Sequence, residues 1–382
     1  MFEPVDKVSR SGFFFKNPAG NGKFVRGGVF QPRLKGDEKT DDLSKLFKLS
    51  KLMGILPIDG SLSFSNTWII YSIVACLSFT VASLGFKTLY LLETDDFRGK
   101  AWHKIIFYCR ALVENAIIVS HVVQIVVHRQ EFAQVLEEMK DSGRDHKSTV
   151  IRFFAPAGYG VLAANIIAIC AFESSSPTST RANLSSAASE MLCFTILVQF
   201  CTALGVFRTE IETLTKRIAV NQAKLEMLAD RRQRILEIAG MTNDIFSIQL
   251  LFICFKLFTD IINFAYFTII RIKDLTTMND GAVITSVIRM PLFAVWKIFE
   301  LYSISASTEQ LVETAEDFNA ELFQLMRDNK ELCKNKKLSL CLALKNTVNF
   351  TACGFFTLGY PLVTSVIAAA TTYLVILVQF SI

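Results

Sequence analysis

The chain ends in the stretch Pro361-Leu-Val-Thr-Ser-Val-Ile-Ala-Ala-Ala-Thr-Thr-Tyr-Leu-Val-Ile-Leu-Val-Gln-Phe-Ser-Ile382, which contains no charged side chain. A helix of this length rises about 1.5 Å per residue and covers the roughly 30 Å hydrocarbon core of a bilayer. Small or weakly polar residues recur on one helical face at steps of three and four: Thr364, Ala368, Thr371, Val375, Val378 and Ile382. Such a face suits close helix packing or the lining of a narrow water path, and composition alone favours packing.

The rest of the chain is also too apolar for an ordinary soluble domain. Its 382 residues are 51% hydrophobic, with a mean hydropathy of +0.38. We therefore expect an all-α membrane protein embedded in a lipid bilayer, with seven transmembrane helices. The expected spans are residues 68–92, 102–127, 153–172, 187–207, 246–270, 283–304 and 361–382.

Positive charge is distributed unevenly between the two sides of these spans. Twenty-nine Lys and Arg residues lie in the segments on the amino-terminal side, against five in the opposite loops. Because cytosolic loops carry the excess of Lys and Arg, the amino terminus is predicted to be cytosolic and the carboxyl terminus extracellular. This orientation is opposite to that of a G-protein-coupled receptor, and the mild net charge of +5 does not indicate nucleic-acid binding.

No pattern typical of a common enzyme is found in the sequence. It lacks GxSxG, P-loop, HExxH and CxxC motifs. His121 and His128 share a helical face, but no third ligand lies near them in sequence, which favours polar packing over a metal site. None of the nine cysteines falls in a predicted extracellular loop, so no disulfide framework is expected. We expect no enzymatic activity, no cofactor and no metal.

The chain is predicted to divide into six segments, in which the spans alternate with cytosolic parts. They are a flexible cytosolic tail (1–50), spans one to four (51–207), a cytosolic helical extension (208–245), spans five and six (246–304), cytosolic anchor helices (305–360) and a pore-lining seventh span (361–382). A short amphipathic helix is expected over 43–56. A further short helix is expected over 350–358, before a break at Gly359 and Pro361.

Both cytosolic segments carry apolar seams at steps of three and four. The first seam comprises Ile211, Leu214, Ile218, Asn221, Leu225, Leu228, Arg232, Ile235 and Ala239, and the second comprises Leu311, Ala315, Phe318, Leu322, Leu325, Asn329 and Leu332. The first segment is basic and the second begins acidic, so they are expected to pack together, either within one subunit or between subunits. We refer to this expected assembly as the anchor domain.

The carboxyl end of the terminal stretch carries a more specific pattern. Thr372-Tyr373 is followed by five apolar residues and then by Gln379-Phe380, two residues from the terminus. This pattern resembles the TY-(five hydrophobics)-QF signature of insect gustatory receptors, and Thr351-Ala-Cys-Gly-Phe-Phe also resembles that family. The resemblance extends over the chain from about residue 43 onward. It implies a ligand-gated, non-selective cation channel in the plasma membrane of a chemosensory neuron, with the seventh helices of a tetramer around one pore.

One departure from the family's sequence pattern reduces the number of ligand classes that are expected. Receptors of the sweet clade usually carry Glu after the Thr-Tyr pair, whereas this chain has Leu374. The resemblance therefore points to a bitter or plant secondary compound as the tastant, with a fructose-type sugar receptor as an alternative. An odorant receptor subunit that needs a co-receptor is the nearest rival from outside the gustatory group. The expected assembly is a homotetramer, or a heteromer with related receptors.

The same topology locates a candidate gate and pore. Gln379 and Phe380 are expected at the outer mouth, where four Phe rings could close the pore by dewetting and four Gln amides could line it when open. The alternative is that both are interfacial anchors. Val375, Val378 and Thr371 are expected to line the pore, and Thr372 and Tyr373 are expected to contact neighbouring helices.

A ligand that enters from outside should meet polar and aromatic residues in the outer half of the spans. The candidates are Tyr108, Arg110 and Glu114 on the second span, Asp260, Asn263 and Tyr266 on the fifth, and Arg289, Phe293 and Trp296 on the sixth. Arg110 and Glu114 are four residues apart and could instead neutralise each other. Lys256 and Lys297 are expected to lie deeper, where they snorkel or pair.

Overall fold

The computed structural model describes residues 41–57, 65–93, 101–142, 153–172, 177–218, 224–275, 281–343 and 348–381. Most of the expected amino-terminal tail, Asn221 of the first seam and Ile382 lie outside these residues. The side chain of Phe380, the candidate gate, is also not described, although its backbone is helical.

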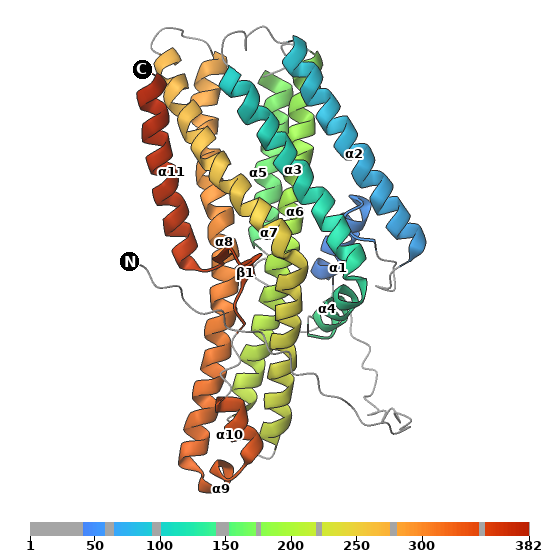
Figure 1. Cartoon of the computed structure of the whole chain (residues 1–382), viewed down its shortest axis with the longest axis vertical. Coiled ribbons are helices and arrows are strands. Elements are labelled where there is room, and N and C mark those ends of the chain that lie inside the picture. Colours follow the sequence, from blue (N-terminus) through green and yellow to red (C-terminus); the bar gives the residue numbers. More distant parts are fainter. Residues whose placement is uncertain are drawn as a thin grey trace, which may run out of the picture. The chain divides into compact units, whose positions relative to one another are not determined.

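The described residues are almost entirely helical (Figure 1). The helices are α1 (Asp41–Leu52), α2 (Asn66–Glu93), α3 (Ala101–Val127), α4 (Arg129–Ser142), α5 (Ala155–Phe172), α6 (Pro177–Ile218), α7 (Leu225–Leu275), α8 (Gly281–Asp328), α9 (Lys330–Cys333), α10 (Lys336–Ala343) and α11 (Tyr360–Ser381). The seven expected spans fall on α2, α3, α5, α6, α7, α8 and α11. The all-α prediction is therefore confirmed for the described residues, apart from one small hairpin.

Five of these helices are long and apolar enough to cross a membrane: α2, α3, α6, α7 and α11. The apolar part of α5 is shorter, over Ala155–Cys170. The apolar stretch of α8 is interrupted by Arg289, Lys297 and Glu300, which lowers its hydropathy. Length and composition thus identify five spans, and the count of seven stays a prediction.

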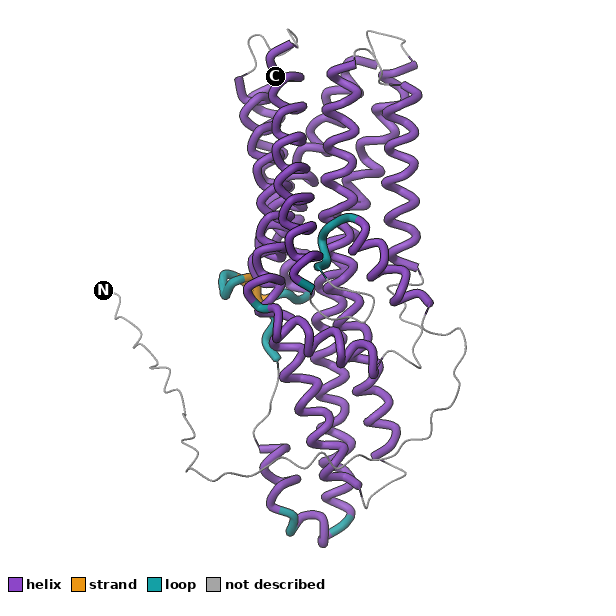
Figure 2. The backbone as a smooth tube through the Cα atoms, turned by 90° about the vertical axis from the view of Figure 1, so that its right-hand side faces the viewer, coloured by secondary structure: helices purple, strands orange, loops and turns teal. Residues whose placement is uncertain are grey.

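Three helices form the centre of the bundle and continue beyond it. α6, α7 and α8 contain 42, 51 and 48 residues, and all three pack against one another. At about 1.5 Å per residue, each is roughly twice as long as the hydrocarbon core is thick. Figures 1 and 2 show the three helices extending well past the level at which α11 begins, toward α9 and α10.

The predicted apolar seams meet in this extension. The buried seam residues are Ile211, Leu214, Ile218, Leu225, Leu228, Arg232, Ile235, Ala239, Leu311, Ala315, Phe318 and Leu322. Arg232 donates a 3.0 Å hydrogen bond to the carbonyl oxygen of Ala315 and lies over the ring of Phe318. The two segments therefore pack within one chain. The first seam does not lie on a single helix, however, because α6 ends at Ile218 and α7 begins at Leu225.

The expected short helix over residues 350–358 is wrong. These residues form a hairpin in which β1 (Thr351–Ala352) pairs antiparallel with β2 (Phe356–Thr357). Cys353 and Gly354 have φ angles of 50° and 73°, and two successive left-handed residues make the tight turn that joins such strands. The hairpin is held on α7, where Thr351 N donates to Asn243 Oδ1 and Cys353 N to Ser247 Oγ.

The amphipathic helix α1 ends in a turn that packs into the bundle. Gly54 has a φ of 71°, Gly54 N donates to Lys51 O, and Ile55 N donates to Ser50 O, which together form a Schellman motif. A Cβ atom on Gly54 would lie 2.8 Å from Ala75 Cβ of α2. Only glycine therefore suits both the backbone angle and the space at this point.

Candidate functional site

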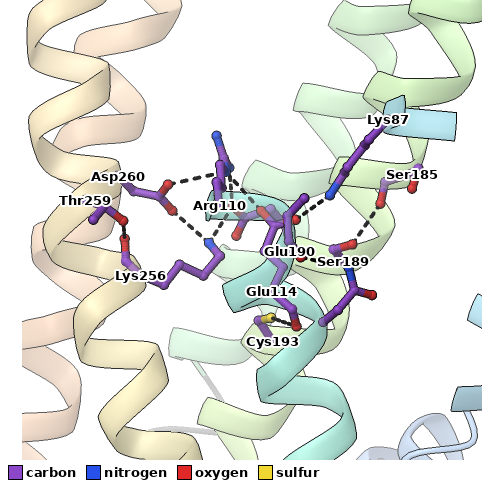
Figure 3. Close-up of polar contacts among 12 residues, drawn as sticks. Lys87, Arg110, Glu114, Ser185, Ser189, Glu190, Cys193, Lys256, Thr259 and Asp260 are labelled. Carbon is purple, nitrogen blue, oxygen red and sulfur yellow. Dashed lines mark hydrogen bonds and ion pairs between the residues drawn. The ribbon is translucent and has the colours of Figure 1, made fainter. Parts of the chain in front are cut away.

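Eight charged side chains from five helices gather within the bundle. We call this set the charge cluster; its members are Lys87 (α2), Arg110 and Glu114 (α3), Glu190 (α6), Lys256 and Asp260 (α7), and Lys297 and Glu300 (α8). Four members are cationic and four are anionic, so the cluster has no formal net charge. Figure 3 shows most of them pointing toward one another from the surrounding helices.

Glu190 is the centre of the charge cluster. Its Oε1 atom lies 2.6 Å from Arg110 Nη2 and 2.6 Å from Lys256 Nζ, and its Oε2 atom lies 3.0 Å from Lys297 Nζ. One carboxylate on α6 is thus shared by cations from α3, α7 and α8.

Each cation bound to Glu190 also has a second carboxylate. Arg110 Nε lies 2.9 Å from Glu114, Lys256 Nζ lies 2.7 Å from Asp260, and Lys297 Nζ lies 3.0 Å from Glu300. Glu114 in turn binds Lys87 of α2 at 2.7 Å. Because a buried charge is costly unless it is paired, this network constrains the relative positions of the five helices.

Arg110 is the member of the cluster that is most accessible. Its side chain is 26% exposed, whereas those of its partners Glu114 and Asp260 are fully buried. The guanidinium group lies over the ring of Phe264, and Nε is 3.4 Å from Asp260 Oδ1, an atom that has no hydrogen bond in the structure. A polar ligand group could therefore contact the cluster at this loosely satisfied edge.

The cluster includes three of the predicted ligand-binding residues, namely Arg110, Glu114 and Asp260. It also shows that Lys256 and Lys297 pair rather than snorkel. Lys87, Glu190 and Glu300 are not among the residues predicted from sequence. The available signal was their position inside apolar runs, where a charged side chain is expected to have a partner.

The other predicted ligand-binding residues lie outside the charge cluster. Tyr108, Asn263, Tyr266 and Arg289 are partly buried. Phe293 contacts Phe264 beside Arg110, with ring centroids 5.7 Å apart. Trp296 belongs to a separate aromatic group, together with Phe154, Phe194 and Phe299.

The terminal helix α11 packs on α7 and α8 but leaves most of its surface uncovered. Among its described side chains, only Ala370 is buried. The predicted pore residues Thr371, Val375 and Gln379 are exposed, and Val378 is partly buried.

Thr372 and Tyr373, which were expected to contact neighbouring helices, make different contacts within the chain. The hydroxyl group of Thr372 donates to Ala368 O of its own helix, and the ring of Tyr373 contacts that of Phe258 on α7 at 5.9 Å.

The two histidines of the shared helical face have separate surroundings. His121 is buried against the ring of Phe246, and His128 Nδ1 lies 2.7 Å from Glu131 Oε2. Within the part of the chain that the structure describes, no group of three or more His, Cys, Asp or Glu residues could hold a metal ion.

The chain is similar to known proteins both in sequence family and in fold. A family model described as 7tm Chemosensory receptor matches residues 43–382. The structure of the insect olfactory receptor OR5 from Machilis hrabei is similar, with a TM-score of 0.61 and 11% sequence identity, over 88% of this chain and 97% of that chain. The same receptor in complex with eugenol gives a TM-score of 0.59, 12% identity and the same coverage. No curated protein sequence matches the chain.

Proposed function

The chain belongs to the 7tm chemosensory receptor family, and from this premise we propose that it is a gustatory receptor: a non-selective cation channel opened by a small organic tastant. The family comprises multi-pass membrane receptors of insects rather than enzymes. The gustatory assignment is carried by Thr372-Tyr373 and Gln379-Phe380 with their five-residue apolar spacer.

The proposed topology has seven spans, formed by α2, α3, α5, α6, α7, α8 and α11. The five long apolar helices support most of it. Pairing of Lys297 and Glu300 inside the bundle supports adding α8, because paired charges are tolerated within a membrane. The excess of Lys and Arg on the amino-terminal side supports a cytosolic amino terminus and an extracellular carboxyl terminus.

The pore is proposed to form between α11 helices of four copies of the chain. The supporting observation is that, among the side chains that the structure describes in this uncharged helix of 22 residues, only Ala370 is buried within the single chain. Its exposed face includes Thr371 and Val375, small enough to line a narrow path, and ends at Gln379 near the proposed outer mouth. The permeant ions would be cations, and the receptor would act in the plasma membrane of a chemosensory neuron.

The tastant is proposed to be a neutral compound, of bitter taste or plant origin. The charge cluster is balanced at four cations and four anions, so a charged ligand group would leave an uncompensated charge in the bundle. The partly exposed guanidinium group of Arg110 offers hydrogen-bond donors beside the ring of Phe264, a combination that suits a ring with hydroxyl groups. The related OR5 was determined with eugenol bound.

An odorant receptor subunit is the second candidate, because the similar solved structures are of an olfactory receptor. Expression of this chain alone in cells without other chemoreceptors separates the two. We expect a neutral phenolic compound to evoke an inward cation current. A current that requires a co-expressed related subunit would favour the odorant assignment, and a response to fructose alone would favour the fructose-type receptor.

The proposed gate is tested in the same cells. We expect Phe380→Ala to produce a leak current without agonist, because the apolar ring that would dewet the closed pore is lost. Phe86→Ala, on an exposed part of α2, is the matched control and should not leak. Unchanged closed-state current in Phe380→Ala would remove this residue as the gate.

A further inference from the structure

An apolar cavity of about 280 Å³ lies on the α2 side of the bundle, and none of its lining residues belongs to the charge cluster. Its lining includes Met53 from the turn after α1, Cys76 and Phe79 from α2, Ile118 from α3, and Met191 from α6. Ile118 is one helical turn beyond Glu114, and Met191 is adjacent to Glu190, so the cavity borders the cluster on its inner side under the proposed topology.

The turn after α1 forms one wall of this cavity. Met53, Gly54 and Ile55 line it, and Ile55 is almost completely buried. The turn is fixed by the Schellman motif at Gly54 and by the hydroxyl group of Tyr71, which donates to Leu52 O at 3.2 Å. The wall that this turn contributes to the cavity is therefore fixed by hydrogen bonds.

The surroundings of the cavity are suited to lipid. The cavity is partly open rather than enclosed. α2, which contributes to its lining, carries a row of exposed apolar side chains: Ile70, Ile73, Val74, Leu77 and Val81. An apolar opening beside a lipid-facing helix will not retain water, because its lining offers few hydrogen-bonding partners. Its volume is close to the lower limit of about 300 Å³ for small-molecule pockets, which favours a slender occupant.

Positive charge lies directly before the cavity in the chain. α1 carries Lys48, which is exposed, and Lys51, whose ammonium group lies 3.8 Å from the ring centroid of Trp68. Met53, the first lining residue, is two positions after Lys51. A Trp beside a Lys is typical of the level of the lipid headgroups, where the anionic lipids of the cytosolic leaflet attract basic side chains.

We propose that this cavity binds an acyl chain of an anionic phospholipid from the cytosolic leaflet, with its phosphate beside Lys48 and Lys51. The proposal uses the topology given above but is independent of the tastant and of the pore. The lipid would occupy the space between the α1 turn, α2, α3 and α6, and would thereby hold α1 against the bundle.

The test is photocrosslinking of the full-length receptor in nanodiscs with diazirine-tailed phosphatidylserine or phosphatidylcholine, followed by mapping of the labelled residues. We expect labelling at Met53, Phe79 and Met191, and its loss in Ala188→Phe, which fills the cavity. Ala164→Phe, on an exposed part of α5, is the matched control and should be labelled as the unsubstituted chain is.

Lys48→Gln keeps the cavity intact and tests the headgroup site separately. We expect it to lower labelling by phosphatidylserine about fivefold, equivalent to about 1 kcal/mol per basic residue near the surface, with little change for phosphatidylcholine. Lys334→Gln, far along the chain in α9–α10, is the control. Labelling that is uniform along α2, or that persists in Ala188→Phe, would overturn the proposal. Equal labelling by phosphatidylserine and phosphatidylcholine that Lys48→Gln leaves unchanged would also overturn it.

Discussion

Replacement of Glu190 by Gln tests the importance of the charge cluster. The substitution keeps the size of the side chain but removes one negative charge, which leaves four cations and three anions buried among five helices. Removing one partner from a buried ion pair costs about 3–5 kcal/mol. Arg110, Lys256 and Lys297 each keep a second carboxylate, so the expected loss of unfolding free energy is near the lower limit, about 3 kcal/mol.

The assay is thermal unfolding of the purified receptor, followed by size-exclusion fluorescence. A loss of about 3 kcal/mol lowers the midpoint by roughly 6 °C, given about 2 °C per kcal/mol for large chains. Glu331→Gln is the control: its carboxylate lies 2.8 Å from Lys334 Nζ, but both side chains are largely exposed. The control should lose less than about 1 kcal/mol.

A second variant separates lost charge from altered shape. Glu190→Gln combined with Lys256→Met leaves three cations and three anions, and Asp260 keeps Arg110 Nε at 3.4 Å, so this variant should recover part of the lost stability. The reasoning is refuted if Glu190→Gln lowers the midpoint no more than Glu331→Gln does.

Two further substitutions test the packing of the bundle and the anchor domain. Gly158→Ala should destabilise the receptor by about 1–3 kcal/mol in the same thermal assay, because the new Cβ would lie 2.0 Å from the Phe194 ring. Gly160→Ala is the control and should not destabilise the receptor, because its Cβ would have no atom within 4 Å. Equal midpoints for the two variants would contradict this packing. Arg232→Met should change stability by less than about 1.5 kcal/mol. Arg232 is buried with a backbone carbonyl and the Phe318 ring as its partners, and Met supplies similar apolar volume. A loss of about 3 kcal/mol or more would indicate that the charge of Arg232 is needed.

The long helices and the seams could be predicted from sequence because their signals are local. Apolar runs and steps of three and four follow directly from helix geometry, and they located α6, α7 and α8 as well as the buried residues of the anchor domain. The division of the first seam between α6 and α7 was not foreseen, because its apolar pattern is the same on both helices.

The hairpin could not be predicted from the same signals. Residues 350–358 are mostly apolar, so their composition resembles that of the adjoining span. The turn needs a left-handed backbone at both Cys353 and Gly354, and glycine adopts this conformation readily whereas cysteine does not. Docking on Asn243 and Ser247, about a hundred residues earlier, then decides the structure.

The charge cluster was predictable in part. A charged residue within an apolar run indicates that a partner exists, and applying this rule to every run would have identified Lys87, Glu190 and Glu300. The rule does not say which helix supplies the partner. That Glu190 joins cations from three helices depends on how α3, α6, α7 and α8 pack, which sequence spacing within one helix does not determine.

The central claim, that this chain alone forms a cation channel lined by α11, is tested most directly by unitary conductance. The purified chain is reconstituted in a planar bilayer, and Gln379→Glu is compared with the unsubstituted receptor and with Gln130→Glu, an exposed position on α4. A ring of added carboxylates at the outer mouth should raise the single-channel cation conductance in Gln379→Glu only. Absence of any current from the purified chain, or a conductance that Gln379→Glu leaves unchanged, would contradict the claim.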